Sequence, residues 1–411
     1  TPIEIHDLIC HQGEAVLVGG VRRTALISLS NHSDERMRNA KSGQWWLENP
    51  QRALANNSIC YTDQPDVGAH MREWLSIYES RSGERGIFNR QACTNMLPAR
   101  RDPNYDFGTN PCSEIVLRSA SFCNLSEVVC RPKDTLATIV VKIGLAALLG
   151  TVQSTLTDFR YLRNIWRKNC EEERLLGVSL TGIFDCPAIL NATPKDLEML
   201  RGIAVGANKK YAKKLGIPAS AAVTCVKPSG TVSQLASCSS GIHPAYNDYY
   251  RRAVRNDKKD PLAQVMIDAG VPYEEDKANA EAWVFYFPIK SEGLTRKSVG
   301  PLQQLEVWRK FALHWCEHKP SMTCYVGEYD WPAVGSWVWD NFDILNGISF
   351  LPSADDGHIY DQAPYEDITK EEYAAMVKKM PKEIDFKFDE NADNTTSSQE
   401  LACSGSSCEL S

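Results

Sequence analysis

The stretch Asn110-Pro111-Cys112-Ser113-Glu114-Ile115 decides how the rest of the sequence is interpreted. As extended backbone or as a loop tip, it would carry Asn110, Cys112 and Glu114 on one side, because alternate side chains of an extended chain share a face. Pro111 lacks a backbone N–H and biases Asn110 towards an extended conformation, which argues against a regular helix. The trio offers a thiol, a proton acceptor and an amide that can orient a hydroxyl. The ordinary alternative is a buried cysteine beside a glutamate that faces solvent.

A second cysteine, Cys123, follows in the segment Ser121-Phe122-Cys123-Asn124-Leu125. The order Asn-Pro-Cys-x-Glu-Ile and then Phe-Cys-Asn-Leu resembles the ribonucleotide reductases, most closely the adenosylcobalamin-dependent, monomeric class II type. This resemblance implies an α/β fold that forms part of a ten-stranded α/β barrel. A central finger loop would carry the radical cysteine, Cys112.

The same resemblance implies a role for each residue of the candidate catalytic set. Cys112 would become a thiyl radical and abstract the 3′ hydrogen of a ribonucleotide, while Glu114 takes the proton of the 3′ hydroxyl. Asn110 would hold the sugar hydroxyls by hydrogen bonds. Cys123 would be one half of the dithiol that reduces the intermediate, and its partner belongs to an N-terminal portion of the family that has no counterpart here.

A candidate phosphate-binding segment follows a predicted strand that ends at Lys227. There Pro suits the first turn of a helix, Ser and Thr can cap it, and the free N–H groups with the helix dipole favour an anion. It is not a Walker loop, which needs Gly-Lys-Ser/Thr at its end, and many capped helices look similar. The resemblance implies that this turn binds the substrate phosphates, and its residues are Pro228, Ser229, Gly230, Thr231, Val232 and Ser233.

The chain divides into two predicted parts. Residues 1–385 would be the C-terminal part of the catalytic barrel domain, and residues 386–411 a flexible redox-active tail. The tail carries Cys403 and Cys408, and a dithiol on a mobile arm can exchange with a buried disulfide. Two incidental cysteines in a polar tail are the alternative. The resemblance implies a redox relay that passes oxidation to an external thioredoxin-like dithiol protein.

The sequence begins Thr1-Pro2-Ile3-Glu4, without Met, and its first segment already resembles the interior of the reductase fold. We therefore expect a complementary N-terminal segment, joined to this chain or supplied separately.

Composition excludes some classes of function. The net charge of −7 and the pI of about 5.7 argue against a general nucleic-acid coat, so we expect no direct nucleic-acid binding. The most apolar run, Ala137 to Val152, contains Lys142 and is too short to span a membrane. Fourteen cysteines in a cytoplasmic protein would be mostly reduced. His314 and His318 share a predicted helix, but without a His-Glu-x-x-His arrangement no metal site is predicted.

The predicted function is reduction of ribonucleoside triphosphates or diphosphates to deoxyribonucleotides. The resemblance implies that adenosylcobalamin starts a thiyl-radical mechanism and that a dithiol is oxidised in each turnover. Two alternatives stay open: the large subunit of a class I reductase, which receives its radical from a partner protein, or an inactive fragment that needs an N-terminal complement.

Overall fold

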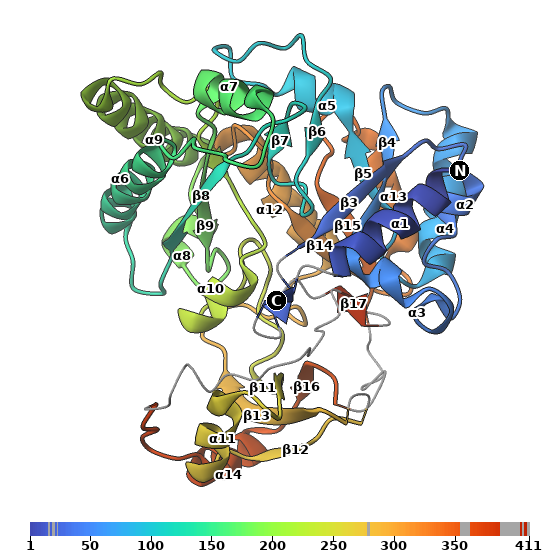
Figure 1. The fold of residues 1–411 in the computed structure, drawn as a ribbon, viewed down its shortest axis with the longest axis vertical. Helices are drawn as coiled ribbons and strands as arrows, with labels where there is room; N and C mark the ends of the chain where they lie inside the picture. The colour runs from blue at the N-terminus through green and yellow to red at the C-terminus, as the bar shows by residue number, and fades with distance from the viewer. Residues whose placement is uncertain are drawn as a thin grey trace.

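The computed structural model describes residues 1–14, 17–18, 21–22, 24–277, 280–353, 362–386, 403–404 and 407–408. Its upper part, in the orientation of Figure 1, is built on two β-sheets. A five-stranded sheet has the order β14 (Met322–Val326), β15 (Ile348–Pro352), β5 (Gly86–Asn89), β4 (Ala55–Tyr61) and β3 (Leu26–Ser30). A three-stranded sheet has the order β10 (Thr224–Cys225), β9 (Leu176–Thr181) and β8 (Asn124–Val129).

One isolated bridge joins the two sheets. Val226, just after β10, pairs in parallel with Pro320, just before β14. The strands β8, β9, β10, β14 and β15 run parallel within each sheet, and β15 meets β5 antiparallel, after which β5, β4 and β3 are again parallel. The three and five strands thus form one array of eight. Among the described residues the outer edges of β8 and β3 pair with no further strand, so the closed ten-stranded barrel stays a prediction.

Two long helices cover the three-stranded sheet, and Figure 1 shows them side by side. The first, α6 (Leu136–Gln153), starts with a capping box in which Thr135 and Thr138 exchange side-chain and backbone hydrogen bonds. The second, α9 (Pro194–Leu215), follows an equivalent cap and ends at Gly216, whose φ of +69° lies in the left-handed region. Buried aliphatic side chains of α6, α9 and β9 form the main core.

The helix α6 is long and apolar enough to cross a membrane by length and composition, which corrects the expectation that this run is too short. Only 33% of its residues are buried inside the structure. A single such helix is weak evidence for a membrane, because a core helix of a globular domain passes the same test. Its exposed side carries Val141, Leu145 and Leu149, each more than half exposed.

A smaller lobe lies below the two sheets in Figure 1. Its sheet has the order β12 (Tyr273–Glu275), β13 (Ala282–Lys290), β11 (Tyr249–Asp257) and β16 (Tyr365–Asp367). The helices α11 (Pro261–Asp268) and α14 (Lys370–Lys379) pack on this sheet. The mixed α/β class is therefore confirmed. The division at residue 385 stays a prediction.

The remaining helices are mostly short and lie around the sheets. They are α1 (Pro2–Glu14), α2 (Glu35–Arg38), α3 (Trp45–Glu48), α4 (Val67–Ser80), α5 (Arg90–Asn95), α8 (Pro187–Leu190), α12 (Pro301–His314) and α13 (Trp331–Asp340).

Most of the predicted tail lies outside the described residues. Its described backbone forms β17 (Cys403–Ser404) and β18 (Ser407–Cys408), which pair antiparallel with Cys403 directly opposite Cys408.

Candidate active site

The stretch around Cys112 is the tip of a β-hairpin. The strands β6 (Gly108–Thr109) and β7 (Val116–Leu117) pair antiparallel, and residues 110–115 connect them. The N–H of Ser113 donates to the carbonyl of Asn110 at 2.9 Å, and Ser113 has a φ of +63°. The prediction that this stretch forms a loop tip is therefore confirmed, but its backbone turns tightly and is not extended. Because alternation holds only for extended backbone, Cys112 and Glu114 do not share a face by periodicity.

The half-buried Cys112 lines a small cavity of about 50 Å³ between the hairpin tip and the five-stranded sheet. The side-chain amide of Asn56, on β4, donates to the carbonyl of Pro111 at 2.9 Å and fixes the loop beside this cavity. Polar groups line the wall: Asn57, Ser82, Ser321, Thr323 and Ser349. The thiol therefore lies in a space that offers hydrogen bonds to a polar molecule.

Glu114 is 2% exposed, and its Oε2 has no hydrogen-bond partner among the described residues. Burial raises the pKa of this carboxyl, while the hydrogen bond from Asn110 and the charge of Lys227 act in the opposite direction. Asn110 is itself fixed, since its Oδ1 accepts the N–H of Ile115 at 2.9 Å. An unpartnered carboxylate oxygen held beside an amide can accept a proton from a bound hydroxyl.

Residues 317–320 hold the finger loop in place through hydrogen bonds. The sequence did not indicate this role. The N–H of Lys319 donates to the carbonyl of Glu114 at 2.9 Å, and the N–H of Val116 donates to Nδ1 of His318 at 3.3 Å. Nε2 of His318 lies 3.0 Å from the carbonyl of Leu176. Burial, with the nearby Arg101, lowers the pKa of His318 well below its usual value, so the ring is neutral and Nε2–H donates. His318 thus links backbone groups. The prediction that it shares a helix with His314 is wrong, because that helix ends at His314.

The hairpin approaches the three-stranded sheet where β9 has a glycine. A Cβ built on Gly177 would lie 2.5 Å from Cδ2 of Leu125 and 3.0 Å from both Sγ of Cys225 and Cδ1 of Ile115. Ile115 directly follows Glu114, so the missing side chain at Gly177 makes room for the loop that carries the candidate base.

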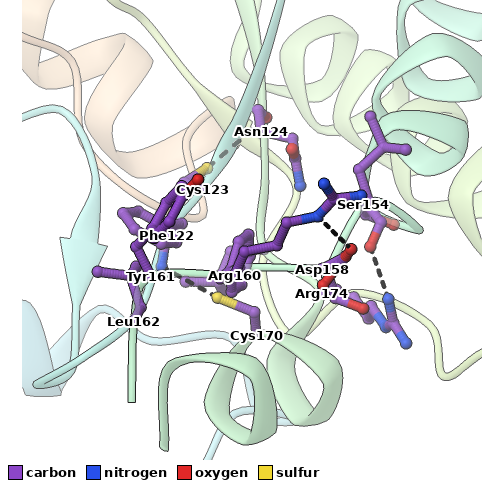
Figure 2. Close-up of a pocket in the computed structure, with 14 residues that line it drawn as sticks. Phe122, Cys123, Asn124, Ser154, Asp158, Arg160, Tyr161, Leu162, Cys170 and Arg174 are labelled. Carbon is purple, nitrogen blue, oxygen red and sulfur yellow. Dashed lines mark hydrogen bonds and ion pairs between the residues drawn. The ribbon is translucent and has the colours of Figure 1, made fainter. Parts of the chain in front are cut away.

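Cys123, just before β8, lines a separate cavity of about 670 Å³, shown in Figure 2. Phe122, Cys170 and Arg160 line it too, and Sγ of Cys170, on α7 (Asn164–Glu173), accepts the N–H of Phe122 at 3.3 Å. Burial and the Glu114 carboxylate raise the pKa of Cys123 well above its usual value, so at neutral pH it is a thiol. Glu114 therefore acts electrostatically on Cys123, although Cys112 and Cys123 line different cavities among those described.

The candidate phosphate segment forms the start of a short helix, α10 (Gly230–Leu235). Ser229 is the N-cap residue with a φ of +46°, but its hydroxyl makes no capping bond, so that part of the expectation is wrong. Instead Oγ of Ser229 is buried without a partner among the described residues. The hydroxyls of Ser233 and Ser240 donate to the carbonyls of Ser229 and Pro228 and fix the turn. Neither described cavity includes residues 228–233.

The sequence also did not indicate that Lys227 and Glu127 form an ion pair. Nζ of Lys227 lies 2.9 Å from Oε2 of Glu127, on β8. The pair brackets Ser179 on β9, whose hydroxyl accepts the N–H of Lys227 at 2.9 Å. The alternation along residues 221–227 was the available signal, because it places Lys227 on the same face as Cys225.

Comparison with known proteins gives the chain a family context. No family model matches the sequence. The adenosylcobalamin-dependent ribonucleoside-triphosphate reductase of Lactobacillus delbrueckii subsp. bulgaricus is 26% identical over 100% of this chain and 60% of its own length. A protein of Dictyostelium discoideum named as a probable reductase of the same kind is 28% identical over 99% of this chain and 54% of its own. The chain thus spans about 60% or less of the length of these relatives.

Solved structures agree on the fold. A B12-dependent, class II ribonucleotide reductase superposes with a TM-score of 0.69 at 24% identity, covering 87% of this chain and 54% of its own. The alpha subunit of the class Id ribonucleotide reductase of Actinobacillus ureae gives a TM-score of 0.55 at 16% identity, covering 80% of this chain and 70% of its own. The chain is thus similar along its whole length to proteins named as adenosylcobalamin-dependent ribonucleoside-triphosphate reductases, and its fold is more similar to that of the class II reductase than to that of the class Id alpha subunit.

Proposed function

We propose that this chain is the C-terminal catalytic part of an adenosylcobalamin-dependent ribonucleoside-triphosphate reductase. The observation that carries the proposal is the finger hairpin, which presents Cys112 to a polar cavity and holds Glu114 buried with an unpartnered oxygen. The names of the relatives favour a triphosphate over a diphosphate substrate. We place the enzyme in the cytoplasm.

In the proposed reaction, the thiyl radical of Cys112 removes the hydrogen atom from C3′, and Glu114 accepts the proton of the 3′ hydroxyl. The 2′ hydroxyl leaves as water after taking up a proton. Cys123 and a second thiol supply two electrons and become a disulfide, and Cys112 returns its hydrogen atom to C3′. The sum is one ribonucleotide and one dithiol converted into one deoxyribonucleotide, one disulfide and one water.

Two further parts of the chain would position the substrate. Asn110 would orient the sugar hydroxyls, since its amide already lies beside Glu114. The turn Pro228–Ser233 would hold the phosphates, and the buried, unpartnered hydroxyl of Ser229 is a donor that a phosphate oxygen would satisfy. A ligand that reaches both would span the space between the hairpin and the end of β10.

Adenosylcobalamin supplies, when bound, the unpaired electron that starts the reaction. The initiating group must be able to reach the thiol, and Cys112 fits this requirement. It is half-buried and borders a cavity, while most of the described cysteines are buried. A hydrogen atom can leave the thiol only if the initiating group can approach it. The chain's own part in this step is to hold Cys112 at the tip of a loop fixed by Asn56 and Lys319.

We further propose that an N-terminal complement closes the sheet array. Within the described part of the chain the array of eight strands is unpaired at β8 and at β3, and two more strands would complete ten. The exposed apolar residues of α6, which packs on β8, lie where such a complement would cover them. The complement would also bring the thiol that pairs with Cys123. We propose Cys403 and Cys408 as the relay that reduces this disulfide and passes oxidation to a thioredoxin-like protein.

The test combines this chain with the N-terminal part of the reductase as a separate polypeptide. We expect deoxynucleoside triphosphate from ribonucleoside triphosphate only when both pieces, adenosylcobalamin and a dithiol are present. Cys112→Ser should form no product. Product from Cys112→Ser would refute the catalytic assignment, and a stable two-piece complex that makes no product would favour the inactive-fragment alternative.

Class I chemistry is the second candidate, supported by the fold likeness to a class Id alpha subunit. It predicts activity that requires a second, radical-generating subunit and that adenosylcobalamin does not replace. The same two-piece assay, with and without the cofactor and with no second subunit, separates the two.

A further inference from the structure

The side of the three-stranded sheet that faces the finger loop carries a partly buried ion pair that the proposed reaction does not use. On β8, Ser126 and Val128 face α6, so Glu127 faces the opposite side, towards the finger loop. Nζ of Lys227 lies 2.9 Å from Oε2 of Glu127, whose side chain is 6% exposed. Glu127 accepts no oriented hydrogen bond from the described residues, so the contact is an ion pair only.

Backbone hydrogen bonds connect this pair to the candidate base. The carbonyl of Glu114 accepts from the N–H of Lys319 at 2.9 Å, and the carbonyl of Lys319 accepts from the N–H of Val226 at 3.1 Å. Val226 directly precedes Lys227. Lys227 is fixed in turn, because its own N–H donates to the hydroxyl of Ser179. These hydrogen bonds fix the backbone of Lys227 relative to the backbone of Glu114.

We propose that Lys227, held by Glu127, is a positioning residue that favours the ionised form of Glu114, the form that can accept the substrate proton. This deepens the proposed function and rests on Glu114 being its base. Lys227 pairs with Glu127 and also acts electrostatically on Glu114, so the two carboxylates compete for its charge. Burial alone would favour the protonated form of Glu114, which cannot accept a proton.

The other groups around the two carboxylates do not supply this charge. Glu114 acts electrostatically on Cys123 and Cys225, but burial raises the pKa of both thiols well above the usual value, so they are neutral and add no charge. Cys238, a neighbour of Glu127, has its pKa raised to about 11 by burial and is neutral too. Lys319 is committed elsewhere, with its Nζ 3.4 Å from the carbonyl of Ala92.

The competition predicts opposite effects for the two members of the pair. Lys227→Met removes the cation, so the pKa of Glu114 rises and the acid limb of the kcat/KM profile moves to higher pH by about 1 unit. Glu127→Gln removes the competing anion, so Glu114 receives the whole charge, its pKa falls and the acid limb moves to lower pH. Lys227→Arg keeps the charge and should keep the limb in place.

The measurement uses two readouts. The first is the pH dependence of kcat/KM in the enzyme reconstituted with its N-terminal part. The second is a carbon-13 NMR titration of glutamate carboxyls in this chain alone, in which Glu114→Gln identifies the signal of Glu114. Lys142→Met is the matched control, because Lys142 also pairs with one carboxylate, Asp134 at 2.5 Å, away from the loop. It should shift neither readout.

Shifts of opposite sign support the proposal, whereas an unmoved Glu114 titration in Lys227→Met, or shifts of the same sign in both variants, would overturn it. The NMR titration needs no turnover. If the wild-type enzyme forms no product, the proposed function fails while the titration still decides whether Lys227 governs Glu114.

Discussion

The glycine at position 177 gives the most direct test of how the finger loop is held. Gly177→Ala adds a methyl group 2.5 Å from Cδ2 of Leu125 and 3.0 Å from Sγ of Cys225 and Cδ1 of Ile115. Carbon atoms in ordinary contact lie about 3.5–4.0 Å apart, so each neighbour must retreat by roughly 0.5–1 Å. Leu125 is 36% exposed and can turn outward, but Cys225 and Ile115 are buried at 0% and 1%. The displacement therefore falls on Ile115 and on Glu114 beside it.

We expect Gly177→Ala to lower the free energy of unfolding by about 1–3 kcal/mol, as overpacking does. A misplacement of about 1 Å at a catalytic group costs on the order of 100-fold in rate, so deoxynucleotide formation should fall by about that factor. Urea unfolding followed by tryptophan fluorescence measures the first effect, and the two-piece turnover assay the second.

Ile115→Val removes the Cδ1 atom that the new methyl group meets. Gly177→Ala/Ile115→Val should therefore regain part of the lost activity, and the two changes should cost less together than the sum of each alone. Gly202→Ala in α9 is the matched control, because a Cβ there meets nothing within 4 Å, and it should stabilise the chain by about 0.5–1 kcal/mol. Wild-type turnover in Gly177→Ala, or no rescue by the second change, would refute this account of the loop.

Three further predictions test separate parts of the site. Cys123→Ser should still exchange the 3′ hydrogen of a tritiated substrate but release no deoxynucleotide, and normal product yield would contradict its role as reductant. With a thioredoxin-like protein as reductant, Cys403→Ser should complete one turnover per enzyme and then stop. Rapid-quench measurement of product per enzyme tests this, and continued turnover would show that the tail takes no part in the mechanism. Arg101→Met should destabilise the chain by about 3–5 kcal/mol in urea unfolding, because it leaves Glu173, 2.7 Å away and buried, with less compensation. The exposed pair of Arg167 and Glu171 is the control, and an equal loss there would contradict the burial argument.

The features that the sequence predicted well are local. Local signals of the same kind stand at other elements: Thr135 and Thr193 cap the starts of α6 and α9, and a short apolar run forms β9. Pro111 and the resemblance to ribonucleotide reductases together predicted that Cys112 lies at a loop tip. The prediction that α6 is too short for a membrane failed because the apolar run was counted without Leu136 and Gln153, which extend the helix.

The features that the sequence did not show depend on contacts between distant segments. His318 and Val116 are 202 residues apart, and no local pattern indicates that the ring accepts that N–H. Glu127 lies on β8 and Lys227 follows β10, and β9 separates these two strands, so the pairing follows from sheet order and not from spacing. The role of Gly177 likewise depends on which loop lies above it.

The open edges of β8 and β3 have a consequence for how the protein can be made. An unpaired strand edge offers hydrogen bonds to any extended chain, including another copy of itself. Residues 1–411 produced alone should therefore be prone to self-association, and simultaneous synthesis of the complement should raise the yield of dispersed protein.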